Sequence, residues 1–339
     1  MRRKGIKKAI RVAGFVAGSA ICLAASAATY LILRKPAIAP PLNIKVEMTP
    51  ERIARGKYIF TLSDCNGCHS GRDFSRFDGP VIEAQRGQGV EFPKEMGLPG
   101  RIASRNITMD VETGIGGWTD GEKIRSIREG ISRDGSTLFP MMPYARYREM
   151  SDEDVMSLVA YLNTLPPVKH RVQPSAVNFP VSVLVKSVPQ PAGSVPPPSR
   201  ADRVKYGGYL VAMAGCADCH TQSERGKPKP GRTLAGGERF AFPGAVVVSA
   251  NISPDPQTGI GRWSEQDFLD KFEGYREYAE KGSPKVGPEN FTVMPWLDFS
   301  QLEVNDLRAI YAFLRTRKPV YHAVDSHPGF EKSELMTKK

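Results

Sequence analysis

The sequence predicts an all-α chain in which two tandem helical domains of related sequence follow one N-terminal transmembrane helix. Three observations predict this arrangement: an uncharged apolar run near the N-terminus, five ordered sequence blocks that occur twice, and helix-start patterns at matching places in both copies. The length of 339 residues also suits two or three domains rather than one.

The N-terminal segment has the pattern of a membrane anchor. Residues 12–33 form a run of 22 residues without charge, and six basic residues precede it. A helix rising ~1.5 Å per residue would cover ~33 Å over this run, enough for a bilayer core of ~30 Å. The positive charge before the run predicts that residues 1–11 are cytoplasmic. A tether at 34–48 would then lead to domains on the periplasmic side of the inner membrane.

A cleaved signal peptide is the alternative for this segment, because Ala25-Ser26-Ala27 fits a cleavage site. The apolar run continues for six residues beyond Ala27, whereas the apolar region of a signal peptide normally ends before the cut. This favours an uncleaved anchor. Cys22 is interpreted as an apolar filler of the run.

The net charge of +11 is concentrated in the same segment. Residues 1–35 hold eight basic residues and no acidic residue, and the rest of the chain holds 39 basic and 36 acidic residues, a net charge of +3. That remainder has no basic run with interleaved aromatic residues, which argues against nucleic-acid binding.

The rest of the chain contains two copies of one sequence pattern, separated by 145–152 residues. We predict one domain at 49–168, a proline-rich linker at 169–202, a second domain at 203–325 and a tail at 326–339. The linker is expected to be partly pinned to a domain, because residues 178–186 are apolar, and the tail is expected to be loosely ordered. The repeated blocks are residues 55–58 and 206–209, 106–108 and 251–253, 113–118 and 258–263, 142–144 and 294–296, and 160–168 and 312–320.

Each copy is expected to open and close with a helix. Thr49-Pro50 is a typical helix start, and residues 151–154 resemble a capping box before an apolar face. Residues 304–314 repeat the apolar spacing in the second copy. Gly56 and Gly207 lack a Cβ, which predicts that the first and last helices of each copy cross closely there.

Each copy also carries a Cys-x-x-Cys-His motif, at residues 65–69 and 216–220. Two thiols at this spacing can add to the two vinyl groups of a haem, and the adjacent histidine then lies under the iron as an axial ligand. A zinc ribbon needs paired motifs about 15–20 residues apart, whereas Cys68 and Cys216 are 148 apart. No βαβ pattern supports a thioredoxin-like pair. We therefore predict two covalently bound haem c groups. The predicted attachment residues are Cys65, Cys68, Cys216 and Cys219, and the predicted proximal iron ligands are His69 and His220.

Met142 and Met294 are the predicted second iron ligands. They follow the motif histidines by 73 and 74 residues, and each precedes a proline at the same place in the repeat. Met141 is not preferred, because Val293 occupies its position in the second copy. The alternative role for a methionine is core packing. A thioether ligand raises the reduction potential and closes the coordination position, which favours electron transfer over catalysis.

Four further repeated residues have less specific roles. Trp118 and Trp263 are candidates for donating an indole N–H to a haem propionate, and a core tryptophan bonded elsewhere is the equal alternative. Asn106 and Asn251 are candidates for ordering the same loop, and a plain turn role is the preferred interpretation. The remaining histidines are interpreted as structural (His170, His322) or exposed (His327).

Residues 106–119, 129–135, 139–144 and 150–154 resemble segments of the multihaem cytochrome c subunits of bacterial membrane-bound dehydrogenases, such as those for gluconate and alcohols. The resemblance covers residues 49–168 more fully than 203–321. It implies class I cytochrome c domains, each with a His/Met haem, and a dehydrogenase subunit that supplies electrons. Those subunits usually carry three haems, whereas this chain has two motifs.

These observations together predict a membrane-anchored dihaem c-type cytochrome that is not itself an enzyme. Electrons would pass from a membrane dehydrogenase or quinone-linked donor, through both haems, to a downstream cytochrome or oxidase of the respiratory chain. Two alternatives are a dihaem peroxidase, which needs an open or displaceable iron position, and a haem sensor or structural subunit.

Overall fold

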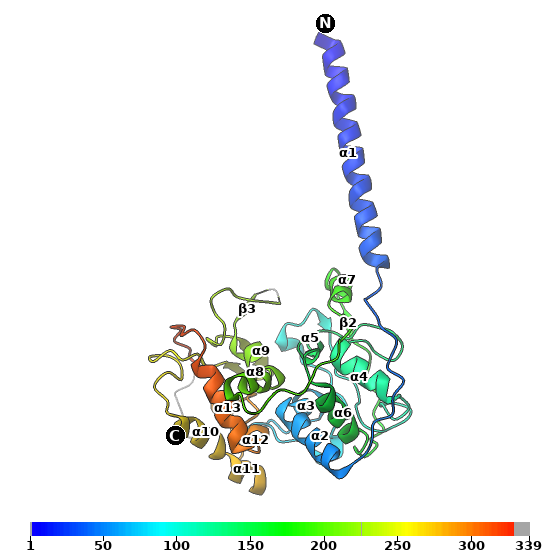
Figure 1. Ribbon diagram of the computed structural model, residues 1–339. Coiled ribbons are helices and arrows are strands. Elements are labelled where there is room, and N and C mark those ends of the chain that lie inside the picture. Colours follow the sequence, from blue (N-terminus) through cyan, green and yellow to red (C-terminus); the bar gives the residue numbers. More distant parts are fainter. Residues whose placement is uncertain (1, 225, 329–339) are drawn as a thin grey trace.

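The computed structural model describes residues 2–224 and 226–328. A long helix, α1 (Arg2–Leu33), projects from a globular part in which two helical domains lie side by side (Figure 1). Residues Val12–Leu33 of α1 are long and apolar enough to cross a membrane, and they are not buried against the described part of the chain. A signal sequence would meet the same criteria of length and composition.

The first domain is built on two crossing helices, α2 (Pro50–Leu62) and α6 (Asp152–Leu162). The predicted start of α2 is confirmed: the Thr49 hydroxyl accepts a hydrogen bond of 3.2 Å from the Arg52 amide, and Pro50 lies in the first turn. The other elements of this domain are α3 (Cys65–His69), η1 (Glu83–Gln85), η2 (Lys94–Met96), β1 (Gly100–Arg101), α4 (Asp120–Glu129) and α5 (Tyr144–Tyr147).

The second domain repeats the crossing with α8 (Arg203–Met213) and α13 (Val304–Arg315). Leu210 and Leu307 are fully buried between these helices and their neighbours, and the buried apolar residues of the two domains form one continuous cluster. The other elements are α9 (Cys216–His220), β3 (Ser223–Glu224), β4 (Lys227–Pro228), β5 (Arg239–Phe242), β6 (Ala245–Val248), α10 (Glu265–Glu273), α11 (Arg276–Lys281), η4 (Pro288–Asn290) and α12 (Trp296–Phe299).

The two crossings depend on glycine, as predicted. A Cβ added at Gly56 would lie 1.8 Å from the Ser157 carbonyl oxygen of α6. A Cβ added at Gly207 would lie 1.9 Å from the Ala309 carbonyl oxygen of α13. Any other residue would therefore force the paired helices apart, and the same close approach is built into both copies.

The expected capping box at the start of α6 forms only in part. The Ser151 hydroxyl accepts from the Asp154 amide at 3.2 Å, but the Asp154 carboxylate does not return to the cap. It accepts instead from Arg55 and Tyr209. Complete capping boxes occur at the starts of α4 and α10, where the sequence interpretation had named none. Tertiary partners thus outcompete the local cap at Asp154.

The described structure is mainly helical, but it also contains three two-stranded antiparallel sheets, which the all-α prediction lacked. The longest pairs β5 with β6 through a turn at Pro243-Gly244, where Gly244 has φ +77°. Three consecutive valines in β6 favour extended backbone. The hairpin lies in the second copy where the two sequences differ in spacing, so the repeat gave no indication of it.

The proline-rich segment is pinned along the first domain. Its β2 (Ala176–Val177) pairs with β1, the Arg128 guanidinium donates to the Gly193 carbonyl at 2.7 Å, and the Asp152 amide donates to the Val195 carbonyl at 2.9 Å. It also forms α7 (Val181–Leu184), which contacts α1, and η3 (Val185–Ser187), whose Lys186 ammonium donates to the Ile32 carbonyl at 2.9 Å. Its apolar stretch packs only partly, because Phe179 stays 76% exposed.

The prediction that His327 is exposed is wrong. Only 8% of His327 is exposed, and its Nε2 lies 2.8 Å from the Phe291 carbonyl oxygen. The Ser326 carbonyl also accepts from the Val248 amide of β6 at 3.0 Å. The segment before residue 329 is therefore held by the β5–β6 region, while most of the predicted tail, residues 329–339, lies outside the described residues.

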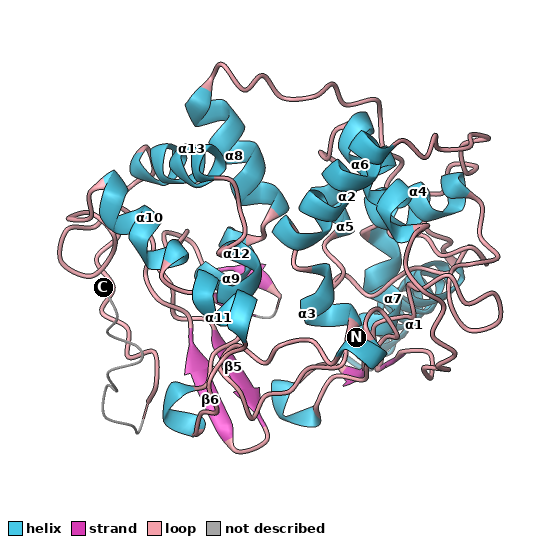
Figure 2. Ribbon diagram, turned by 90° about the horizontal axis from the view of Figure 1, so that it is seen from below, coloured by secondary structure: helices cyan, strands magenta, loops and turns pink. Residues whose placement is uncertain are grey.

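Figure 2 shows the helix pairs of the two domains, α2 with α6 and α8 with α13, lying next to each other. A loop of the first domain, around Phe77, also packs into the second domain. The Phe77 amide donates to the Pro284 carbonyl at 2.8 Å, and the Val286 amide donates to the Ser75 carbonyl at 3.0 Å. The Phe77 ring is fully buried and stacks on Tyr275 with centroids 5.1 Å apart. The loop follows the first Cys-x-x-Cys-His motif directly, so this contact brings that motif to the domain interface.

Candidate haem-binding sites

Each Cys-x-x-Cys-His motif forms a short helix of its own, α3 in the first domain and α9 in the second. One turn of helix places both thiols of a motif close together. All four thiols are free, and burial raises the pKa of each, to about 12 for Cys68 and about 11 for Cys216. They are therefore neutral thiols, available to form thioether bonds to a haem.

The two motif histidines have the same orientation. The Nδ1 atom of His69 lies 2.7 Å from the Arg105 carbonyl oxygen, and the Nδ1 atom of His220 lies 2.7 Å from the Ala250 carbonyl oxygen. A carbonyl only accepts, so Nδ1 carries the proton and Nε2 keeps its lone pair. Burial also lowers the pKa of both imidazoles, which keeps them neutral. Both rings are thus prepared to bind iron through Nε2.

Asn106 and Asn251 fix the loops that supply these carbonyls. The Asn106 amide donates to the Val168 carbonyl at 2.8 Å and accepts from the Thr108 amide at 2.9 Å. Asn251 repeats both bonds, to Val320 at 2.8 Å and from Ser253 at 2.9 Å. The turn interpretation was too narrow. Each asparagine directly follows the residue whose carbonyl accepts from the motif histidine, and its side chain bonds this loop to the segment after the last helix of the domain. The repetition in sequence was the available indication of this role.

Met142 and Met294 occupy equivalent loops. Each lies before a one-turn helix, α5 or α12, and its carbonyl accepts from the amide two residues later at 2.8 Å, from Tyr144 and Trp296 respectively. Both side chains are partly buried against the apolar core. The structure therefore gives the two methionines the same local setting in each domain.

Trp118 and Trp263 are also equivalent in structure. Both are half-buried against the core, and their amides donate to Ile115 and Ile260 at 3.0 and 3.1 Å. Neither indole N–H bonds another residue in the described part of the chain, so the propionate role stays a prediction. The side chain of His170 is exposed, whereas Nδ1 of His322 lies 2.9 Å from the Ala235 carbonyl oxygen.

Comparison with known proteins agrees with this geometry. The family model of cytochrome c matches residues 53–166 and again residues 204–318. The chain therefore belongs to the cytochrome c family, a class of electron-carrying haem proteins, and it contains two cytochrome c domains.

Several curated relatives are similar over both domains. The cytochrome c subunit of a quinone alcohol dehydrogenase from Gluconacetobacter polyoxogenes is 30% identical over 307 residues, 87% of this chain and 61% of the relative. A dihaem cytochrome c-type protein from Cereibacter sphaeroides is 30% identical over 308 residues, 88% of this chain and 96% of the relative. The gluconate 2-dehydrogenase cytochrome c subunit of Pantoea cypripedii is 30% identical over 64% of this chain and 49% of its own length. The chain thus spans about three fifths of the alcohol dehydrogenase subunit but nearly all of the dihaem protein.

The matches to two cytochrome c domains and to a dihaem relative show that the chain carries two haem c groups, as the two motifs predicted. The observed side chains fit these groups, since each domain offers two neutral thiols and one imidazole with a free Nε2.

Proposed function

We propose that this chain is a membrane-anchored dihaem cytochrome that passes electrons from a membrane dehydrogenase or quinone-linked donor to a downstream cytochrome or oxidase. The observation that carries the proposal is the equivalence of the two motifs. Both histidines donate Nδ1–H to a loop carbonyl at 2.7 Å, and both loops are tied down by an asparagine. Two domains built alike around haem suit electron transfer through both.

The iron ligands in this proposal are His69 with Met142 and His220 with Met294, as in class I cytochrome c domains. The shared setting of the two methionines supports this assignment. These four side chains would hold the two haems, each haem would supply one-electron redox chemistry without binding substrate, and the thioether would favour the ferrous form. The haems supply the redox chemistry, and the protein supplies ligands, orientation and a partly dry surrounding.

The proposed location of the chain is supported by its N-terminal helix, and its proposed partners are supported by its relatives. An uncleaved α1 would hold the haem domains, with boundaries near 49–168 and 203–325, at the periplasmic face of the inner membrane. Relatives are named as cytochrome subunits of dehydrogenases for alcohols, fructose and gluconate. A dehydrogenase subunit is therefore the proposed electron donor.

A redox titration of the membrane-purified chain with its copurifying subunits tests this function. We expect two low-spin haems of high potential, reduced when the substrate of a copurifying dehydrogenase is added. A high-spin haem in the native protein would contradict the ligand assignment, and substantial peroxide turnover would favour the peroxidase alternative. A membrane-bound chain that starts at its encoded N-terminus would distinguish an anchor from a cleaved signal peptide.

A further inference from the structure

The short helix that follows each predicted methionine ligand, α5 or α12, makes a polar contact with the other domain at or near its haem-attachment motif. In the first domain Met142 is followed by α5, whose Arg146 forms an ion pair with Asp218. Asp218 is the residue directly before Cys219 in the second motif. The Arg146 side chain is largely buried, at 18% exposed, and that of Asp218 is 59% exposed. Its guanidinium also packs on Gly215, where an added Cβ would lie 3.2 Å from Nη1.

The next residue along α5 contacts the chain just before the first motif. Tyr147 is 4% exposed, and its hydroxyl donates to the Ser63 carbonyl at 3.3 Å, two residues before Cys65. Burial raises the pKa of Tyr147, so its hydroxyl stays protonated and available to donate. The Arg146 guanidinium carbon lies 5.8 Å from the Tyr147 ring centroid. Two consecutive side chains therefore reach the two attachment regions: Arg146 contacts the second motif, and Tyr147 contacts the residue that lies two positions before the first.

The second domain makes the reciprocal approach. The Leu297 amide in α12 donates to the Asp78 carboxylate at 2.8 Å, and Asp78 is paired with Arg72, three residues after the first motif. Asp298, which lies four residues after Met294 as Arg146 does after Met142, is near enough for its charge to act on Asp64 beside Cys65. Contacts from both domains thus bring the haem-attachment regions to the domain interface.

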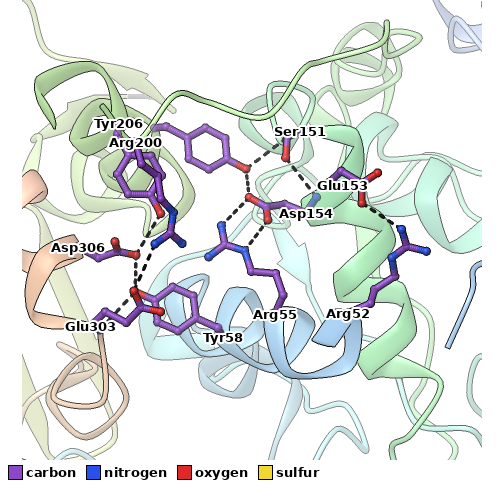
Figure 3. Close-up of polar contacts among 11 residues, drawn as sticks. Arg52, Arg55, Tyr58, Ser151, Glu153, Asp154, Arg200, Tyr206, Glu303 and Asp306 are labelled. Carbon is purple, nitrogen blue, oxygen red and sulfur yellow. Dashed lines mark hydrogen bonds and ion pairs between the residues drawn. The ribbon is translucent and has the colours of Figure 1, made fainter. Parts of the chain in front are cut away.

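The two domains are also joined by hydrogen bonds that lie away from the motifs. Figure 3 shows Tyr58 and Asp306 pointing toward each other from the two domains, with Arg55 and Asp154 beside them. The Tyr58 hydroxyl donates to Asp306 at 2.6 Å, and the Tyr209 hydroxyl donates to Asp154 at 2.6 Å. These bonds offer a control, because they join the same two domains without contacting a motif.

We propose that Arg146 is a positioning residue for electron exchange between the two haems, and that Arg146 and Tyr147 form the protein bridge between their attachment edges. The inference rests on the proposed electron-transfer function. One electron leaves a ferrous haem, which becomes ferric, and reduces the ferric haem of the other domain to ferrous, without proton transfer. The rate of electron tunnelling falls steeply as the distance between two haems grows. The contact between Arg146 and Asp218, which holds the second motif against the first domain, would therefore also set the rate of electron exchange. The positive charge of Arg146 also favours the ferrous form of the second haem.

The experiment uses the full haem-loaded chain in detergent with no partner protein. One haem is reduced by a light pulse, and the equilibration of the electron between the haems is followed optically in Arg146→Gln, Asp218→Asn and the exchanged pair Arg146→Asp/Asp218→Arg. We expect Arg146→Gln to slow equilibration about tenfold or more, as misplaced reacting groups do. The control Tyr209→Phe is expected to stay within about twofold, as for a distant and independent site.

Potentials separate this role from simple packing. Arg146→Gln is expected to lower the potential of the second haem and Asp218→Asn to raise it, with the exchanged pair returning toward the native value. Because Asp218 is exposed, its variant keeps the test available if Arg146→Gln fails to fold. The proposal is overturned if equilibration and potential are unchanged in the Arg146 or Asp218 variant, or if Tyr209→Phe slows equilibration equally. Since no dehydrogenase is present, these outcomes are independent of whether a dehydrogenase reduces the chain.

Discussion

The Tyr58 hydroxyl of the first domain donates a hydrogen bond of 2.6 Å to the Asp306 carboxylate of the second. Tyr209 and Asp154, the equivalent residues of the repeat, make the same bond in the opposite direction, also at 2.6 Å. Each opening helix thus reaches the closing helix of the other copy. The domain interface is a reciprocal exchange between equivalent residues, and this symmetry explains why both haem motifs face it.

Removing the Tyr58 hydroxyl tests the strength of this exchange. Tyr58→Phe is expected to lower the free energy of unfolding by about 2 kcal/mol, because a buried carboxylate loses one donor. Asp306 keeps a second bond, from Tyr206 at 3.2 Å, which limits the loss. Denaturant unfolding of the haem-loaded chain measures it, with Tyr321→Phe as the control because Tyr321 is 64% exposed. Equal stability of the two variants would contradict the prediction.

The close helix crossing predicts a large effect of Gly56→Leu. The new Cβ would meet the Ser157 carbonyl oxygen at 1.8 Å, so α2 and α6 must separate. We expect a loss of about 3 kcal/mol or more in the stability of the first domain. Gly193→Ala is the matched control, since nothing lies within 4 Å of a Cβ added there. A melting temperature of Gly56→Leu equal to that of the control would refute the crossing.

The ligand assignment predicts separable effects of the two methionines. Met142→Ala should convert one haem to high spin and lower its potential, and Met294→Ala should do the same to the other haem. Each variant is expected to lose about half of the ferric sulfur-to-iron absorption, because each haem contributes one thioether bond. Met141→Leu is the control and should leave the spectrum unchanged. Loss of the band in Met141→Leu would move the ligand to Met141.

Two buried carboxyl groups near the first motif predict a pH dependence of stability. Burial raises the pKa of Asp64 to about 7, with the charge of Asp298 adding to the rise, and burial also raises the pKa of Asp298. The folded chain therefore holds a proton that the unfolded chain releases above its ordinary pKa of about 4. Stability is expected to be highest below that value and to fall as pH rises toward about 7.

Melting temperatures of the haem-loaded chain between about pH 5 and pH 9 measure this dependence. Asp298→Asn removes the opposing charge, so the fall should weaken and move to lower pH. Glu95→Gln is the control because Glu95 is exposed. A flat profile in the native chain, or an unchanged profile in Asp298→Asn, would show that these carboxyls are ionised throughout.

The sequence by itself determined the cofactor and the repeat. Haem attachment depends on the spacing of Cys65, Cys68 and His69, which is a local property of the sequence and does not depend on the tertiary fold. The helix start at Thr49 and the crossing at Gly56 were also predictable, because capping and the absence of a Cβ act through near neighbours. Internal repetition added Met142 and Met294 as ligand candidates, and the absorption spectra of their alanine variants test that assignment.

Tertiary structure decided how these parts are joined. Tyr58 and Asp306 are 248 residues apart, and Arg146 and Asp218 belong to different domains, so no local pattern relates them. The burial of His327 and the β5–β6 hairpin were missed for the same reason, because both depend on surfaces formed by distant segments. A spacing rule predicts the atoms that bind a haem, whereas only packing decides that the two haem-attachment regions lie at the domain interface.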